Sequence, residues 1–164
     1  MVSAVVLAAG AASRFGSPKQ RLLLAPVLER VRRTRSIDEI VVVVGAHEVD
    51  TDARVVRCPE WERGPGASLR CGLAGLSPSA AAAVVVLADG PILAPESIDR
   101  IVAASYGGQR GHPLVLDRRL WTRIPDEGAR ALEPVLVPCD DLGAPGDIDV
   151  PEDLPGRVRG TGAE

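Results

Sequence analysis

The chain has 164 residues, a formal net charge of −3, 46% hydrophobic residues and only 2% aromatic residues. This length and apolar content predict one soluble domain that buries roughly 70% of its unfolded surface. The acidic balance and the scarcity of aromatic rings argue against a nucleic-acid-binding protein, and no apolar run approaches the ~20 residues of a membrane span. The dense basic run at 30–35 is typical of a solvated helix face.

The N-terminal run at 2–7 is short, mostly β-branched and without helical periodicity, which predicts a buried strand. The sequence L-A-A-G-A-A-S-R-F-G-S-P-K occupies 7–19. Gly10 and Gly16 allow a close backbone approach that turns N–H groups toward anionic oxygens. Arg14 and Lys19 add cations suited to a polyphosphate. We therefore predict an anion-binding loop at the carboxyl end of the first strand, where ligands of open α/β sheets bind.

This loop does not fit the better-known phosphate-binding patterns. A P-loop needs G-x-x-x-x-G-K-[ST], whereas Gly16 is followed by Ser17 and Pro18. A dinucleotide fingerprint needs G-x-G-x-x-G, whereas Gly10 is followed by two alanines. A signal peptide would account for the apolar residues 1–13 with their A-x-A spacing, but the basic n-region is missing. The polyphosphate interpretation is therefore favoured.

The rest of the chain alternates between strand-like and helix-like segments, which predicts a three-layer α/β/α domain with a mostly parallel, Rossmann-like sheet. A helix is expected to open at Pro26, where apolar residues recur at helical spacing. The ten residues at 45–54 are too few for a full crossover helix. Further strands are expected at 40–44, 55–58, 83–87, 114–116 and 135–137, and further helices at 65–76, 95–105 and 126–132. We expect one domain over 1–156 and a frayed C-terminal tail over 157–164.

The three cysteines, Cys58, Cys71 and Cys139, are odd in number, widely spaced and without a C-x-x-C pair. This pattern favours free thiols over a disulfide framework or a zinc site. Because free thiols are typical of a reducing compartment, we expect a cytoplasmic protein.

Two acidic motifs, one at Asp89 and one at 147–154, are candidates for a functional site. Asp89 follows the expected strand at 83–87, close to where the first loop should emerge, and a carboxylate near bound phosphates is what Mg²⁺ requires. By itself, an Asp that begins a D-G-P turn is more often a turn residue than a ligand. The second motif, D-I-D-V-P-E-D-L at 147–154, has the composition of a helix N-cap followed by Pro and acidic first-turn residues.

Taken together, these segments resemble the MobA-like NTP transferase family over residues 2–154. The first loop fits the family pattern L-A-[AG]-G-x-[SG]-x-R-[MF]-G-x-x-K at every fixed position except Ala12. Asp89 matches the family's L-x-D-x-P, and the motif at 147–154 differs from D-I-D-T-P-E-D-L only at Val150. Residues 57–69 are similar to N-P-x-W-x-x-G-x-x-x-S-[LV], and Gly111-His112-Pro113 is similar to a G-H-P element.

The resemblance implies a nucleotidyltransferase fold and Mg²⁺-dependent transfer of a nucleoside monophosphate from an NTP to a phosphorylated acceptor, with release of pyrophosphate. It implies that Asp89 and Asp149 hold the metal and that His112 contacts the acceptor. The residues implied in catalysis are Arg14, Lys19 and Asp89, and those implied in nucleotide binding are Leu7, Ala8, Ala9, Gly10, Arg14, Lys19, Gly66 and Ser68. Guanylyl-transferring relatives usually have Gly at position 9, so Ala9 favours CTP over GTP, with molybdopterin as the acceptor.

Two alternatives remain from the sequence. Some actinobacterial sequences that resemble this one carry the name nicotine blue oxidoreductase, which implies an NAD(P)H-dependent reductase, although the dinucleotide fingerprint is absent. Segments 20–25 and 45–54 are shorter than is usual in the family, which is compatible with a nucleotide-binding relative that lacks catalysis, because small displacements in a pocket cost much of its rate.

Overall fold

The computed structural model describes residues 1–164 except 13–14, 18, 101–102, 145, 147 and 155–164. The expected tail over 157–164 therefore lies outside the described residues. A seven-stranded sheet forms the middle of the molecule, in the order β3-β2-β1-β4-β6-β5-β7. Strands β1 (Val2–Ala8), β2 (Glu39–Val44), β3 (Arg54–Arg57) and β4 (Ala82–Leu87) are mutually parallel. The valine-rich, mostly buried sequences of β1, β2 and β4 explain this arrangement, since parallel strands are covered on both faces, whereas β3 is an edge strand with mostly exposed side chains.

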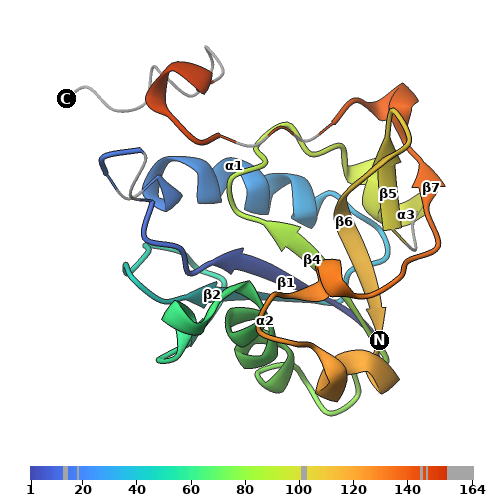
Figure 1. Ribbon diagram of the computed structural model, residues 1–164, viewed down its shortest axis with the longest axis horizontal. Helices are drawn as coiled ribbons and strands as arrows, with labels where there is room; N and C mark the ends of the chain where they lie inside the picture. Colours follow the sequence, from blue (N-terminus) through green and yellow to red (C-terminus); the bar gives the residue numbers. More distant parts are fainter. Residues whose placement is uncertain (13–14, 18, 101–102, 145, 147, 155–164) are drawn as a thin grey trace.

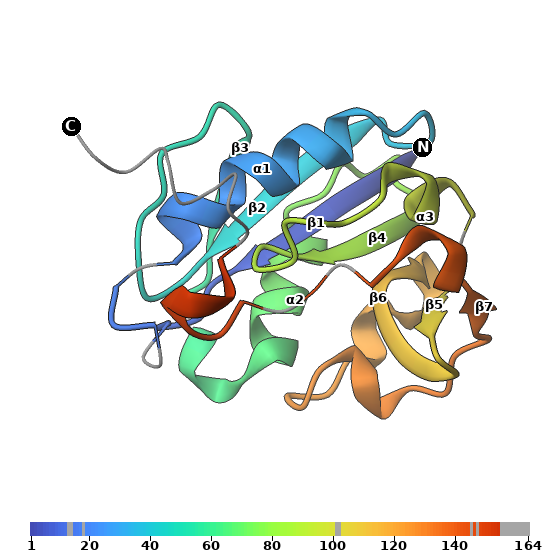
Figure 2. The ribbon, with the colours of Figure 1, turned by 90° about the horizontal axis from the view of Figure 1, so that it is seen from above.

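Helices cover both faces of the sheet, which confirms the expected three-layer α/β architecture (Figures 1 and 2). Side chains alternate along β1, so that Val6 packs beneath α1 (Gln20–Arg32) and α3 (Pro95–Arg100), while Val5 packs against α2 (Pro65–Ala74). Helix α2 lies so close to the sheet that a Cβ at Gly72 would stand 2.5 Å from Val5 Cγ1. None of the described helices is long and apolar enough to cross a membrane.

The first helix begins earlier than the sequence analysis predicted. Helix α1 starts at Gln20, directly after Lys19, and Pro26 lies inside it rather than at its start. The buried side chains Leu23 and Leu24 extend the apolar stripe upstream of the proline, and their burial compensates for the one helical hydrogen bond that the proline cannot make. Segment 20–25 is therefore the first part of a helix.

The second half of the sheet, formed by β6, β5 and β7, meets the first half through an antiparallel pair of strands, β4 and β6. Strand β6 (Gln109–Asp117) pairs antiparallel with β4 and with β5 (Ala103–Tyr106), and β7 (Val137–Pro138) pairs parallel with β5. The expected helix over 95–105 is wrong in its second part: α3 ends at Arg100, and β5 turns into β6 through Gly107 and Gly108, both at positive φ. A two-residue turn of that kind favours a hairpin.

The remaining elements are short 3₁₀ turns at Trp61–Arg63, Arg118–Arg123, Ala129–Ala131, Asp140–Leu142 and Pro151–Asp153. The helix expected over 126–132 is thus reduced to one turn. No helix forms over 45–54, as predicted.

The expectation of free thiols is wrong for two of the three cysteines, because Cys58 and Cys71 form a disulfide, with their Cα atoms 5.6 Å apart, while Cys139 is free and buried. Spacing in the sequence could not show that the residue after β3 lies beside α2.

Candidate active site

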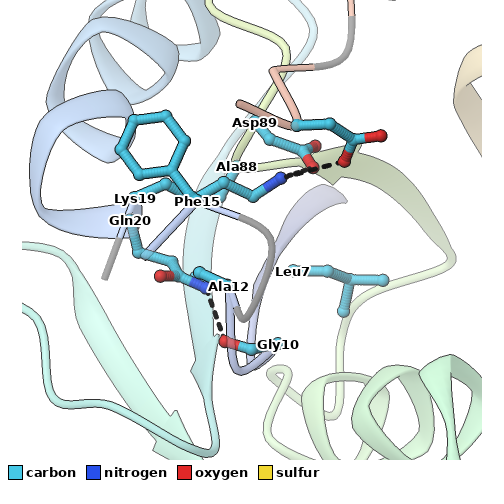
Figure 3. Close-up of a pocket in the computed structure, with 10 residues that line it drawn as sticks. Leu7, Gly10, Ala12, Phe15, Lys19, Gln20, Ala88 and Asp89 are labelled. Carbon is cyan, nitrogen blue, oxygen red and sulfur yellow. Dashed lines mark hydrogen bonds and ion pairs between the residues drawn. The ribbon is translucent and has the colours of Figure 1, made fainter. Parts of the chain in front are cut away.

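A pocket of about 240 Å³ opens at the carboxyl ends of β1 and β4 (Figure 3). The chain runs from β1 outward to β2 and β3 on one side of β1. It then crosses back to β4 on the opposite side of β1, so the strand order reverses between β1 and β4. This reversal is where open α/β sheets bind ligands. The lining residues are Leu7, Ala8, Gly10, Ala12, Phe15, Lys19, Gln20, Ala88, Asp89 and Asp149.

The ammonium group of Lys19 lies among three oxygens in this pocket. Lys19 Nζ is 2.6 Å from the carbonyl oxygen of Ile148, 2.9 Å from Asp89 Oδ2 and 3.6 Å from Asp149 Oδ1. Figure 3 shows the lysine reaching from the start of α1 toward Asp89. The side chain of Lys19 is only 14% exposed, against 27% for Asp89 and 42% for Asp149, so the cation is the most enclosed of the three groups.

The closing acidic motif is held against the first loop by packing and by a backbone hydrogen bond. Ile148 is buried with Phe15 and Leu23 in a small apolar cluster, which ties 148–149 to the start of α1. The Ile148 N–H donates to the carbonyl oxygen of Asp89 at 3.2 Å. The packing of Ile148 and this backbone hydrogen bond thus bring together two carboxylates that are far apart in the sequence, and both contact Lys19 Nζ.

The oxygens around Lys19 Nζ are a donor set that suits a small divalent cation. The carboxylates of Asp89 and Asp149 and the Ile148 carbonyl supply hard oxygen atoms that all lie within 3.6 Å of Lys19 Nζ, a position that therefore favours positive charge. No group of three or more His, Cys, Asp or Glu side chains that could hold a metal occurs among the described residues. Mg²⁺ does not need one, because it takes one or two carboxylates and completes its shell with phosphate and water.

The loop after β1 presents unused backbone donors. In the described part of the chain, the N–H groups of Gly10, Ala11 and Ala12 have no hydrogen-bond acceptor. Ala12 has φ of 53°, an uncommon value for a residue with a side chain, and its carbonyl oxygen accepts a hydrogen bond from Phe15 N–H at 3.0 Å. A Cβ at Gly10 would meet nothing within 4 Å, so the space above the loop is open. Consecutive free N–H groups beside a cation form a cradle for an anionic group.

Six of the predicted site residues line this one pocket: Leu7, Ala8, Gly10, Lys19, Asp89 and Asp149. Arg14 lies outside the described residues. Ala9 does not line the pocket: it is buried in the core cluster on the α2 face, and its carbonyl oxygen accepts a hydrogen bond from Ala46 N–H. Any influence of Ala9 on the nucleotide therefore passes through the position of the loop.

Gly66 and Ser68 are not brought into this pocket either. The Gly66 N–H donates to the carbonyl oxygen of Asp126 at 2.9 Å, and a Cβ at Gly66 would stand 1.7 Å from the carbonyl oxygen of Pro125. The glycine is thus required for close packing of the 125–126 segment against α2. Arg70 and Arg63 both bind the Asp126 carboxylate, and their guanidinium groups lower its pKa.

His112 lies on β6, preceding a cis peptide bond to Pro113. It is two residues before Leu114, which pairs with Val85 of β4, so the antiparallel strand carries His112 toward the end of β4 from which Asp89 extends. His112 does not line the pocket. It therefore lies on the strand that neighbours β4, outside the residues that line the pocket.

Sequence reasoning did not find two residues that contact the loop. Gln20, 4% exposed, donates from Nε2 to the carbonyl oxygen of Gly10, and His47 contacts the carbonyl oxygen of Ala11 through Nε2. The sequence signal that could have identified Gln20 is a polar side chain on the otherwise apolar, buried face of α1. His47 gave no comparable indication, because it follows β2 in an irregular segment.

Comparisons with known proteins identify a family and several solved structures that the chain resembles. The family model described as MobA-like NTP transferase domain matches residues 4–136. Among solved structures, Rv0371c from Mycobacterium tuberculosis H37Rv is 28% identical with a TM-score of 0.71, over 91% of this chain and 93% of that chain. A complex of Rv0371c with manganese is 25% identical with a TM-score of 0.61, over 84% of this chain and 86% of that chain. An Rv0371c homologue from Mycobacterium sp. strain JC1 is 24% identical with a TM-score of 0.72, over 91% of this chain and 90% of that chain. No curated protein matches the chain.

Proposed function

Because the chain belongs to the MobA-like NTP transferase family, we propose that it transfers a nucleoside monophosphate from an NTP to a phosphorylated small-molecule acceptor. An oxygen of the acceptor phosphate forms a bond to the α-phosphorus, the bond from that phosphorus to the oxygen bridging the β-phosphorus breaks, and pyrophosphate leaves. One observation carries the proposal: a single pocket combines unused N–H donors at 10–12 with a cation enclosed by Asp89 and Asp149.

The chain's own residues account for binding and for charge neutralisation. The N–H groups of Gly10, Ala11 and Ala12 would bind phosphate oxygens, and Lys19 and Arg14 would offset the negative charge of the triphosphate. These groups act mainly by fixing the α-phosphate in line with the attacking oxygen, since phosphoryl chemistry requires little covalent participation by the protein.

A divalent metal, Mg²⁺ in this proposal, would be held by Asp89, Asp149 and the Ile148 carbonyl oxygen. When bound, such an ion stabilises the negative charge that develops on the phosphates. The manganese complex of Rv0371c shows that a related protein binds a divalent cation. The observation from this chain is the donor set itself, which already surrounds a positive charge.

For the nucleotide we propose CTP over GTP, and for the acceptor a molybdopterin-type phosphorylated compound. The support for CTP is Ala9, which stands where guanylyl-transferring relatives usually have Gly. Because the Ala9 methyl group is buried in the core, we expect it to act by setting the position of the loop. His112, carried toward the end of β4 by β6, is the proposed acceptor contact.

Pyrophosphate release across a panel of NTPs and phosphorylated acceptors tests the proposal. CTP with a phosphorylated acceptor and Mg²⁺ should give the fastest release, and omission of the acceptor should reduce it to background. A parallel reaction with NADH or NADPH and a quinonoid dye should give no change in absorbance. Reduction of the dye without pyrophosphate release would favour the oxidoreductase alternative, and tight NTP binding without release would favour a non-catalytic relative.

A further inference from the structure

Three successive carbonyl groups of the loop after β1 are each bound by a donor from outside that loop. The Ala9 carbonyl oxygen accepts from Ala46 N–H at 3.1 Å. The Gly10 carbonyl oxygen accepts from Gln20 Nε2 at 2.6 Å, a contact drawn in Figure 3. The Ala11 carbonyl oxygen lies 2.9 Å from His47 Nε2, and since a carbonyl oxygen only accepts, the Nε2 atom carries the proton.

These contacts determine where the unused donors of the loop point. In a planar trans peptide, the carbonyl of one residue and the N–H of the next lie in one plane and point in opposite directions. A donor that holds the carbonyl of residue 9, 10 or 11 therefore directs the N–H of residue 10, 11 or 12 to the other side. Those are the same three N–H groups that have no acceptor in the described part of the chain.

We propose that Gln20 and His47 are positioning residues, which hold the carbonyl groups of Gly10 and Ala11 so that the following N–H groups face the phosphates. This inference rests on the proposed function. Gln20 gives an independent sign of the role: its Oε1 is buried with no hydrogen-bond partner among the described residues, an arrangement that does not favour folding. The unsatisfied Oε1 of this buried amide is explained if the amide is needed for the hydrogen bond that its Nε2 donates to the loop.

The test compares variants that keep or remove each donor. His47→Gln places an amide nitrogen near the position of Nε2, whereas His47→Leu and Gln20→Leu remove the donor. The exposed Gln109 is the other glutamine of the chain, and Gln109→Leu is the matched control. Binding of CTP with Mg²⁺ and of inorganic tripolyphosphate is measured by calorimetry, and KM and kcat are measured in the transfer assay.

We expect His47→Leu and Gln20→Leu each to weaken binding of both probes by roughly 10-fold and to raise KM more than they lower kcat. His47→Gln should bind within about 3-fold of wild type, and Gln109→Leu should bind as wild type does. Binding of both leucine variants within about 2-fold of wild type, or equal loss in His47→Gln and His47→Leu at unchanged Tm, overturns the inference. Absence of binding by the wild-type protein would instead overturn the proposed function.

A second, independent observation concerns the ammonium group of Lys19, which occupies the place that the proposed metal requires. Its three oxygen neighbours are the ones that would coordinate a divalent cation. Two cations cannot share this position, so ammonium and metal compete. The four-carbon stem of lysine is flexible enough to carry the ammonium group to a nearby phosphate.

We infer that Lys19 is an internal counter-ion that keeps the metal position filled until a triphosphate draws it away. Metal binding without nucleotide is therefore weak, and nucleotide and metal bind cooperatively. This inference also rests on the proposed function, and it gives Lys19 two effects of opposite sign: it strengthens nucleotide binding and weakens binding of the free metal.

Binding of Mn²⁺ to nucleotide-free protein, followed by electron paramagnetic resonance, tests this inference. Lys19→Met keeps the length of the side chain and removes its charge, and Arg21→Met removes an exposed charge two residues along as the matched control. We expect Lys19→Met to bind Mn²⁺ at least about 10-fold more tightly than wild type or Arg21→Met, while it binds CTP more weakly. Unchanged or weaker Mn²⁺ binding by Lys19→Met overturns the inference, whereas unchanged Mn²⁺ binding by Asp89→Asn would overturn the proposed metal site.

Discussion

The two halves of the sheet are built in different ways. From β1 to β4 the strands are parallel, the side chains of β1, β2 and β4 are mostly buried, and regular hydrogen bonds within strands and helices hold the backbone. From β5 onward the chain forms a hairpin and short turns held by side chains. Arg110 donates to the carbonyl oxygens of Ala129 and Leu132, and Arg118 donates to that of Ala80.

From this difference we predict separate roles for the two halves. The pocket draws its walls from the regular half, where the ends of β1 and β4 are fixed by the sheet, and among the described lining residues only Asp149 comes from the other half. A polyphosphate site needs fixed geometry, which a buried parallel sheet provides. In the second half, individual arginine side chains hold the backbone, so the residues that would contact the acceptor can differ without disturbing the sheet. The comparison predicts that changes in the first half alter nucleotide chemistry and that changes in the second alter stability or acceptor choice.

The largest expected effect tests the carboxylates. Asp89→Asn should lower Mg²⁺-dependent turnover on the order of 100-fold or more, with Asp149→Asn similar or milder, because an amide is a poor ligand for a divalent cation. Asn is nearly isosteric with Asp in turns, so the melting temperature should stay close to that of wild type. Full Mg²⁺-dependent activity in both variants would remove these residues from the metal site.

The next effect concerns the two cations of the first loop. Lys19→Ala and Arg14→Ala should each weaken NTP binding by roughly 10- to 150-fold, because each loses a charge-assisted contact that contributes about 1.5 to 3 kcal/mol. Calorimetric titration of folded variants measures the loss, and far-ultraviolet circular dichroism controls for folding. NTP affinity equal to wild type in both variants would mean that the loop does not bind the triphosphate.

A third change separates the halves directly. Arg110 donates to the carbonyl oxygens of Ala129, Arg130 and Leu132, and partial burial lowers the pKa of its guanidinium group. Arg110→Met should lower the free energy of unfolding by about 2 kcal/mol, since the partly buried carbonyl groups of Ala129 and Leu132 lose a charged donor. CTP affinity at a temperature where the variant is folded should not change. A large loss of CTP affinity at full stability would show that the halves are not separate in function.

The smallest expected effect concerns the choice of nucleotide. Wild type should bind CTP more tightly than GTP by roughly 10-fold, and Ala9→Gly should reduce that difference, because steric discrimination of this kind contributes only about 1 to 3 kcal/mol. Titration of both nucleotides into both proteins measures the change. A wild-type preference for GTP would contradict the cytidylyl proposal and leave nucleotidyl transfer intact.

The sequence predicted the regular half well, because buried strands and the loop pattern leave clear marks in the residues. It placed Lys19, Asp89 and Asp149 as functional residues, and the structure brings them to one pocket. It could not place Gly66, because the packing partner at 125–126 is distant in the sequence and carries no periodic pattern. It also missed the hairpin after α3, since two glycines after a helix-like run are equally compatible with a helix end.

The contacts of Gln20 and His47 were beyond sequence reasoning for a different physical reason. Each is a single side chain that binds a backbone carbonyl of the loop, and such a contact depends on tertiary placement rather than on local propensity. Pairing of Cys58 with Cys71 has the same origin, because it requires the end of β3 to lie beside α2. In our proposal, the contacts of Gln20 and His47 hold the N–H groups of the loop toward the phosphates.

The most direct test of the central claim is a crystal structure of the protein with Mn²⁺ and a non-hydrolysable CTP analogue, in which anomalous scattering locates the metal. The account predicts one Mn²⁺ ion contacting Asp89 and Asp149, phosphate oxygens on the N–H groups of 10–12, and Lys19 on the triphosphate. A metal and triphosphate bound away from the ends of β1 and β4, with Lys19 still on Asp89, would contradict it.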